Sequence, residues 1–171
     1  MRKILIVIDM QNDFIDGTLG TLEAQAIVPN VKKKIEEYKA RGDEIIFTRD
    51  THFDNYLETN EGKHLPVEHC LKYSEGCEVT DEIDIKDCKH IDKETFGHIG
   101  WWFTLVGEEE IESIEIVGVC TSICVVSNAL IIKAQFPEID ITVDASCCAC
   151  VTPESHKTAL EAMKLCQINI I

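Results

Sequence analysis

Residues 3–14 read KILIVIDMQNDF, and this stretch decides the fold. An unbroken run of isoleucine, leucine and valine precedes Asp9, as expected for a parallel strand whose two faces are both covered. A polar turn follows directly after Asp9. A strand of this kind predicts an α/β protein in which helices cover both sides of a sheet.

The same alternation of short apolar runs and helical segments continues to the end of the chain. We expect one domain over residues 1–171, built as a three-layer α/β/α structure around a mostly parallel, doubly wound six-stranded sheet. The irregular stretch 49–87 is longer than ordinary connections, which indicates a functional loop. Besides the first strand, the expected strands are 44–48, 90–92, 114–119, 139–143 and 168–171; the expected helices are 29–41, 122–135 and one that begins at Pro153 with Thr152 as its cap.

Composition narrows the class of protein. The 171 residues carry a formal net charge of −15, which argues against a nucleic-acid-binding surface. The apolar runs are too short to cross a bilayer. Asp9 interrupts the first of them and no small-residue cleavage site follows, so a secretion signal is not expected. We therefore expect a cytoplasmic protein that binds neither nucleic acid nor membrane.

The chain has nine cysteines, an odd number in a sequence without an export signal. Reduced thiols are the better interpretation, most of them acting as small buried apolar side chains. The run CCAC at residues 147–150 resembles half of a metal site, but no second pair of ligands lies at a suitable spacing.

Two strand ends carry groups suited to catalysis. Asp9 closes the first strand, and the fourth ends in GVCTSIC, which contains Cys124 near the start of a helix that Thr121 would cap. If these strands are neighbours where the strand order reverses, both groups face one crevice. A helix amino end favours a thiolate, and a nearby carboxylate could accept its proton. A cysteine in an apolar helix could equally serve packing alone.

A second set of polar residues lies in the long loop. Asp50 and His52 are two residues apart, and His69 follows within LPVEHC. One carboxylate and two imidazoles suit Zn²⁺ or a similar divalent metal, although such groups often only form hydrogen bonds with one another.

Five strings resemble the isochorismatase-like cysteine hydrolases, and the nicotinamidase-related group in particular. They are ILIVIDMQNDFIDG, TRDTHF, LPVEHC, IDKETF and GVCTSICVVSNAL, in the family's order, from residue 4 to beyond residue 130. The resemblance implies a catalytic triad of Asp9, Lys93 and Cys124. In it the aspartate takes the thiol proton and later activates water, the lysine stabilises the charged pair, and the cysteine forms a thioester. Outside this context Lys93 would be taken for a surface lysine.

The resemblance also implies an oxyanion hole and a metal. A non-proline cis peptide is expected at Val119–Cys120, with the backbone N–H groups of Cys120 and Cys124 facing the oxyanion. A divalent metal, zinc first among the candidates, is expected to hold the ring nitrogen of the substrate. Its implied ligands are Asp50, His52, His69 and Glu61, with Glu58 as the rival of Glu61.

The implied substrate pocket contains Phe14, Leu65 and Trp101. Leu65 stands where nicotinamidases usually carry an aromatic residue, which weakens the expectation of nicotinamide itself. The aromatic residues at 101–103 could instead pack in the core.

The sequence thus predicts an enzyme that cleaves the C–N bond of a small amide, in the manner of a nicotinamidase, and that assembles as a homo-oligomer like its family. The alternatives are an amidohydrolase of carbamoyl or ureido compounds, and a zinc- or thiol-based redox sensor on the same fold. The cysteine count motivates the second alternative.

Overall fold

The computed structural model describes all 171 residues and contains one wholly parallel six-stranded sheet. Its strand order is β3-β2-β1-β4-β5-β6, so the order reverses beside β1. This confirms the predicted doubly wound sheet and the predicted contact between the first and fourth strands. The strands are β1 Arg2–Ile8, β2 Glu44–Asp50, β3 Lys89–Lys93, β4 Ile111–Val119, β5 Asp140–Ala149 and β6 Asn169–Ile170.

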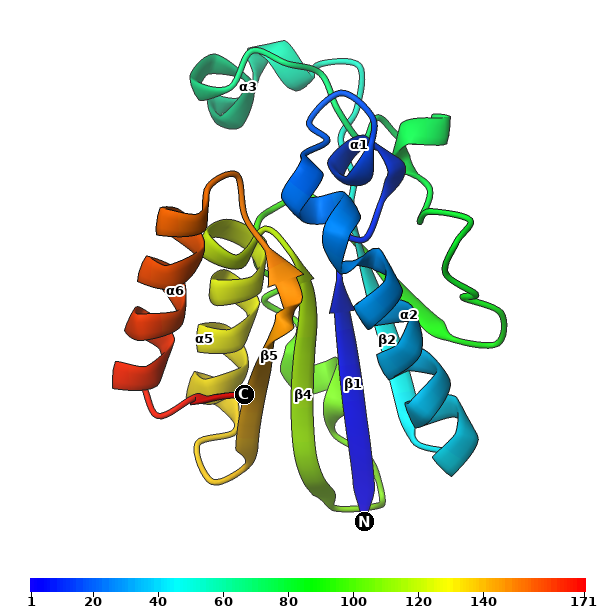
Figure 1. Cartoon of the computed structure of the whole chain (residues 1–171), viewed down its shortest axis with the longest axis vertical. Coiled ribbons are helices and arrows are strands. Elements are labelled where there is room, and N and C mark those ends of the chain that lie inside the picture. Colours follow the sequence, from blue (N-terminus) through cyan, green and yellow to red (C-terminus); the bar gives the residue numbers. More distant parts are fainter.

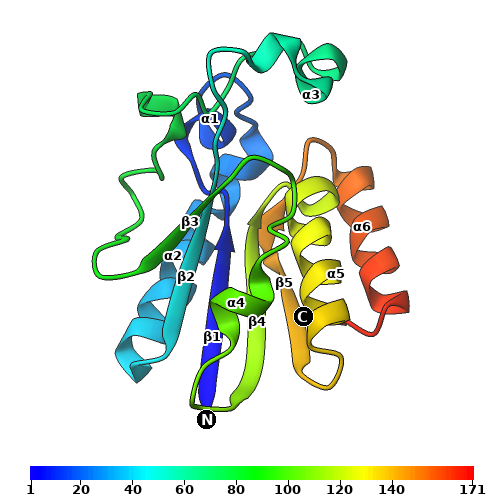
Figure 2. The same cartoon turned by 180° about the vertical axis from the view of Figure 1, so that it is seen from behind.

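Helices cover both faces of this sheet. One face packs against α2, which lies in front of the strands in Figure 1. The other face packs against α4, α5 and α6, and Figure 2 shows the molecule from this side. The helices are α1 Asn12–Ile15, α2 Leu22–Arg41, α3 Asn60–His64, α4 Trp101–Leu105, α5 Val126–Gln135 and α6 Pro153–Leu165.

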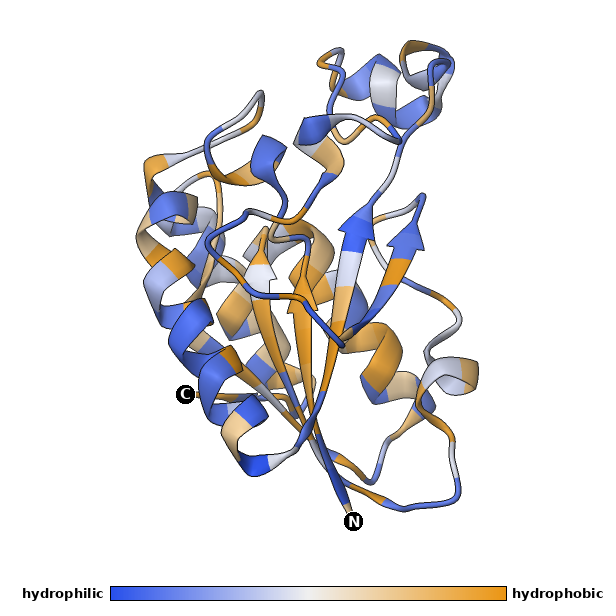
Figure 3. Cartoon of the chain, turned by 90° about the vertical axis from the view of Figure 1, so that its right-hand side faces the viewer, coloured by the Kyte–Doolittle hydropathy of each residue, from blue (hydrophilic) through white to orange (hydrophobic).

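The sequence pattern of β1 explains this layering. Ile4, Ile6 and Ile8 join the core on the side of α5, whereas Leu5 and Val7 join the core on the side of α2. Because successive side chains of a strand point to opposite faces, a strand between two helical layers must be apolar at every position. The strands at the centre of the sheet are accordingly hydrophobic along most of their length in Figure 3.

Among the boundaries that differ from the prediction, two have a clear physical reason. Helix α2 begins at Leu22, where the Thr21 side chain accepts a hydrogen bond from the Ala24 N–H, and it continues through Pro29, which the sequence suggested as its start. Strand β5 continues to Ala149 because its register against β4 shifts after Ile116. The CCA of the cysteine run therefore belongs to the strand and does not follow it.

The close approach of β4 to the end of β1 depends on a glycine. Gly118 has φ +120°, and a Cβ at this position would lie 2.1 Å from the Ile8 carbonyl oxygen. Only glycine permits so close an approach of β4 to β1. Asp9, the residue that follows Ile8, has φ 49°. This conformation is uncommon for a residue with a side chain and is found more often at functional sites. This arrangement brings the ends of β1 and β4 together.

Candidate active site and metal centre

Asp9, Lys93 and Cys124 meet at the carboxyl ends of the strands. Lys93 Nζ lies 2.6 Å from Asp9 Oδ2 and 3.7 Å from Cys124 Sγ. The Thr48 hydroxyl donates to Asp9 Oδ1 over 2.6 Å. All three triad side chains are almost completely buried. The structure thus brings together a carboxylate, a cation and a thiol that belong to three different elements.

The charges of this group depend on one another. Burial acts to lower the pKa of Lys93, but the nearby Asp9, Cys124 and Asp50 outweigh burial and raise the pKa above its ordinary value. The ammonium therefore stays charged. Burial raises the pKa of Asp9, and the Lys93 ammonium opposes that shift. An ion pair with a buried ammonium at 2.6 Å keeps the Asp9 carboxylate able to accept a proton.

The state of the Cys124 thiol differs from the prediction. Burial raises the pKa of Cys124 well above its ordinary value, Asp9 adds to that effect, and Lys93 only opposes it. The helix amino end therefore does not make a standing thiolate. Instead the thiol keeps its proton and interacts with the Asp9 carboxylate, which is the group placed to remove it.

The turn that holds Cys124 is wider than an ordinary helical turn. Residues Thr121–Val125 form a π-helical turn that continues into α5, and the Val125 N–H donates to the Cys120 carbonyl. Cys120, rather than Thr121, occupies the cap position. The Val119–Cys120 peptide is cis, as the resemblance implied, and the Cys120 N–H donates no hydrogen bond within the chain. This N–H is free to bind an oxyanion.

The four side chains that were expected to bind a metal lie together, three in the loop that follows β2 and one, Asp50, at the end of β2. Asp50, His52, Glu61 and His69 place one ligand atom each within 4.8 Å of one another. His52 Nε2 lies 3.0 Å from Asp50 Oδ2, and His69 Nε2 lies 3.7 Å from Glu61 Oε1. Glu61 belongs to this group and Glu58 does not.

The donor set fits a divalent metal. His69 Nδ1 lies 2.8 Å from the Val67 carbonyl, so a proton on Nδ1 is held there and Nε2 is left with a free lone pair. Burial and the Asp50 carboxylate raise the pKa of Glu61, while the two histidines oppose the shift. Two carboxylates packed together in a largely buried place are what a divalent cation would stabilise.

Asp50 connects the two groups. One of its oxygens faces the histidines, and the other lies 3.3 Å from Lys93 Nζ. The Gln11 side chain fixes this strand end, accepting from the Asp50 N–H and donating to the Asp50 carbonyl. Sequence reasoning missed Gln11, although its place two residues after Asp9, in the polar turn that follows the first strand, was an available signal.

One cavity of about 870 Å³ joins the thiol to the metal-binding group. Cys120, Cys124 and the four metal-binding residues line it together, as do Phe14 and Leu65. Trp101 requires correction, because it is fully buried in the core against α5 and does not reach the cavity. Phe96 lines the cavity instead, and its place in IDKETF, three residues after Lys93, could have indicated it.

Asn128 holds the segment around Cys124 in place. Its amide nitrogen donates to the Cys124 and Phe96 carbonyls, and its Oδ1 accepts from Trp101 Nε1 and the His98 N–H. The residue is fully buried, so each of these groups would lose its partner in a variant that lacks the amide.

We expect Asn128→Ala to lower the free energy of unfolding by about 3 kcal/mol, because several buried polar groups are left without partners. Urea unfolding followed by circular dichroism measures this change. Gln135→Ala is the matched control on the same helix, since its side chain makes one exposed hydrogen bond, to the Ile99 carbonyl. Equal stability of the two variants would contradict the assigned role.

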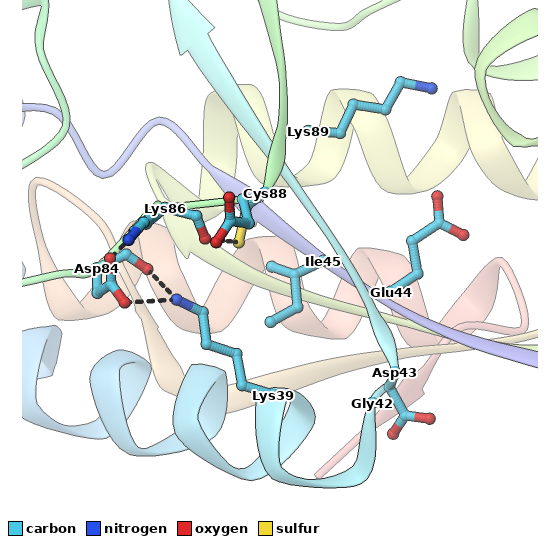
Figure 4. A pocket seen from close by; sticks show the side chains of 10 residues that line it. Lys39, Gly42, Asp43, Glu44, Ile45, Asp84, Lys86, Cys88 and Lys89 are labelled. Atoms are coloured by element: carbon cyan, nitrogen blue, oxygen red, sulfur yellow. Dashed lines mark hydrogen bonds and ion pairs between the residues drawn. The ribbon is translucent and has the colours of Figure 1, made fainter.

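A second hollow, of about 550 Å³, lies at the amino ends of β2 and β3 (Figure 4). Within it, the Lys39 ammonium pairs with the Asp84 carboxylate. It holds no group comparable to the buried triad, which favours the larger cavity as the functional site.

The cysteine run does not form a metal site. Cys147 joins the core on the side of α2, Cys148 joins the opposite core, and Cys150 contacts Ser122. The only group of metal-binding side chains in the structure is the one around Asp50. The geometry therefore does not favour a zinc sensor built on these thiols.

No helix is long and apolar enough to span a membrane.

Comparisons with known proteins identify a matching family and several similar proteins. The family described as Isochorismatase domain matches residues 3–171. A nicotinamidase of Saccharomyces cerevisiae is 24% identical over 214 residues, covering 99% of each chain. Among solved structures, a pyrazinamidase of Pyrococcus horikoshii in complex with zinc is 28% identical with a TM-score of 0.81, covering 100% of this chain and 99% of that one. A pyrazinamidase/nicotinamidase of Streptococcus mutans is also 28% identical, with a TM-score of 0.85 and 99% of each chain covered.

Proposed function

Because this chain belongs to the isochorismatase family, we propose that it hydrolyses the C–N bond of a small ring-bearing amide through a thioester on Cys124. One observation carries the proposal. The buried Cys124 thiol lies next to the Asp9–Lys93 ion pair in a cavity whose other side carries a metal-binding group. A nucleophile, its base and a group that can orient a substrate thus line one cavity.

In the proposed reaction, Asp9 takes the thiol proton while the Cys124 sulfur attacks the amide carbonyl carbon. The backbone N–H groups of Cys120 and Cys124 stabilise the oxyanion that forms. Asp9 then passes the proton to the leaving nitrogen, and ammonia departs from the thioester. Asp9 next removes a proton from water, whose oxygen attacks the thioester carbon. The C–S bond then breaks, the carboxylic acid is released, and Asp9 returns the proton to the Cys124 sulfur. Lys93 remains charged throughout and balances the negative charge on Asp9 and on sulfur.

Asp50, His52, Glu61 and His69 are the residues that would hold a divalent metal, of which zinc suits the mixed nitrogen and oxygen ligands best. When bound, such an ion offers a Lewis-acidic position for a ring nitrogen or another donor of the substrate. Phe14, Leu65 and Phe96 supply the apolar walls against which a ring could lie.

Nicotinamide is the first substrate to test, because relatives similar to this chain are described as nicotinamidases and pyrazinamidases. The aliphatic Leu65 in the pocket wall makes carbamoyl and ureido compounds the second class. We expect ammonia release from nicotinamide and pyrazinamide in a coupled assay. Release from neither of these, nor from any carbamoyl or ureido compound, with or without zinc, would overturn the proposal.

We expect the chain to bind one zinc ion at this group, and zinc to raise the midpoint of thermal unfolding because it binds only the folded state. His69→Ala is expected to weaken binding by more than about 100-fold, since even a lost partner of a metal ligand costs about 10- to 100-fold. Metal analysis after dialysis and titration calorimetry measure both effects. His64→Ala is the matched control, because His64 lines the same cavity but lies outside the ligand group. Equal zinc affinity of the two variants would contradict the assignment.

A further inference from the structure

Two thiols outside the triad lie side by side at the ends of neighbouring strands. Gly118 pairs with Cys148 and Val119 pairs with Ala149, and the next residues along the two strands are Cys120 and Cys150. Neighbouring strands run about 4.8 Å apart. A disulfide requires Cα atoms about 4.4–6.8 Å apart. Continued by one residue, this register would place Cys120 and Cys150 side by side at a spacing that a disulfide can bridge, and their side chains are in contact.

The surroundings give the two sulfurs different roles. Contacts with Cys120, Ser122 and Ser155 lower the pKa of Cys150 to about 4. Burial opposes this shift but does not outweigh it. The Ser122 hydroxyl lies 2.9 Å from the Cys150 sulfur. The same contact with Cys150, together with burial, raises the pKa of Cys120. Cys150 is therefore the thiolate of the pair and Cys120 is its protonated partner.

The pair adjoins the reaction site without belonging to the triad. Cys120 is half-buried and lines the same cavity as Cys124, and its N–H is one of the two proposed oxyanion donors. Cys150 is buried, and the next residue, Val151, lines the cavity. The Cys150 sulfur does not line the cavity, so a small oxidant in the cavity reaches it past Cys120, whereas burial raises the pKa of the Cys124 thiol and makes it less reactive towards oxidants.

We propose that hydroperoxides oxidise Cys120 and Cys150 to a reversible disulfide, and that this disulfide inhibits the reaction in the cavity. The Cys150 thiolate attacks the peroxide oxygen, the O–O bond breaks, and the departing alkoxide or hydroxide takes up a proton. This step oxidises the sulfur by two electrons to a sulfenic acid and reduces the peroxide to an alcohol or water. The Cys120 sulfur then attacks the sulfenic sulfur, and the Cys120 proton leaves with the hydroxyl as water.

The disulfide would pull the Cys120 side chain towards β5 and turn its backbone N–H away from the cavity. The loss of one oxyanion donor lowers the turnover rate by about 100-fold. This effect on turnover rests on the proposed function, whereas the formation of the disulfide does not.

The test treats the full chain with hydrogen peroxide, alkylates the remaining thiols and maps tryptic peptides by mass spectrometry. Cys120 lies in peptide 94–133 with Cys124, and Cys150 lies in peptide 134–157 with Cys147 and Cys148, so the disulfide joins two peptides and their fragmentation spectra identify the bonded cysteines. We expect this cross-link, a fall in ammonia release of about 100-fold, and recovery of both with dithiothreitol.

Cys150→Ser is expected to lose the cross-link and to keep its activity under the same peroxide treatment. Cys147→Ser, altered in the same strand, is expected to keep the cross-link. Mapping of the unaltered chain decides the matter even if a variant fails to fold. Irreversible inactivation without a cross-link, or a disulfide that involves Cys124 or Cys148, would overturn the inference. If no amide is hydrolysed at all, the proposed function fails, while the peptide map still decides on the dithiol.

Discussion

Cys124→Ala is expected to lower kcat for amide hydrolysis by at least about 10⁴-fold, as the removal of a covalent nucleophile does in other hydrolases. The sulfur lies 3.7 Å from Lys93 Nζ, which in turn lies 2.6 Å from Asp9 Oδ2. Steady-state ammonia release measures the loss. The fold is expected to persist, because alanine leaves the Asp9–Lys93 ion pair intact.

Cys166→Ala serves as the control for Cys124→Ala, because Cys166 is exposed. It is expected to hydrolyse the substrate at the rate of the unaltered chain. A Cys124→Ala variant that is folded by circular dichroism and releases ammonia at that same rate would rule out the thioester mechanism.

The second large effect is expected for Lys93→Met. The Lys93 ammonium lies between the buried carboxylates of Asp9 and Asp50. Methionine matches its length but leaves both carboxylates without their cation, which typically costs about 3–5 kcal/mol of unfolding free energy. Because unpaired buried carboxylates have a raised pKa, the loss should be greatest at neutral pH and smaller in acid, where they bind protons. Urea unfolding at several pH values measures it.

Lys89→Met provides the matched control on the same strand, since Lys89 is exposed and donates only to the Thr104 carbonyl. The double variant Asp9→Asn, Lys93→Met should recover part of the lost stability, because one of the two unpaired charges is removed. If Lys93→Met and Lys89→Met were equally stable, the Asp9–Lys93–Asp50 arrangement would be refuted.

The sheet was predictable because its signals are local. The apolar run before Asp9 and the run that ends at Cys120 each determine a buried strand, and the right order of strands places their ends together. The start of α2 was missed because Pro29 mimics a first helical position, whereas the hydrogen bond of the Thr21 cap decides the boundary. The length of β5 depends on a register shift against β4, which no local pattern encodes.

The site was only partly predictable, for a related reason. Asp50, His52 and His69 could be proposed from residue type, but the choice of Glu61 over Glu58 depends on how the loop folds. Trp101 and Phe96 are both aromatic, and only packing decides that the first fills the core and the second lines the cavity. The Cys124 thiol was expected to be acidic from its helix position, yet burial and the Asp9 charge outweigh the helix end.

The most direct test of the account is to locate the acyl group during turnover. Acid quenching of the enzyme with saturating nicotinamide, or with the amide that the ammonia assay selects, followed by peptide mass spectrometry, should show the acyl group on Cys124 within peptide 94–133. The account predicts that this adduct forms and decays at rates that match turnover. An acyl group on any other side chain, or turnover in which Cys124 can be replaced without loss, would contradict it.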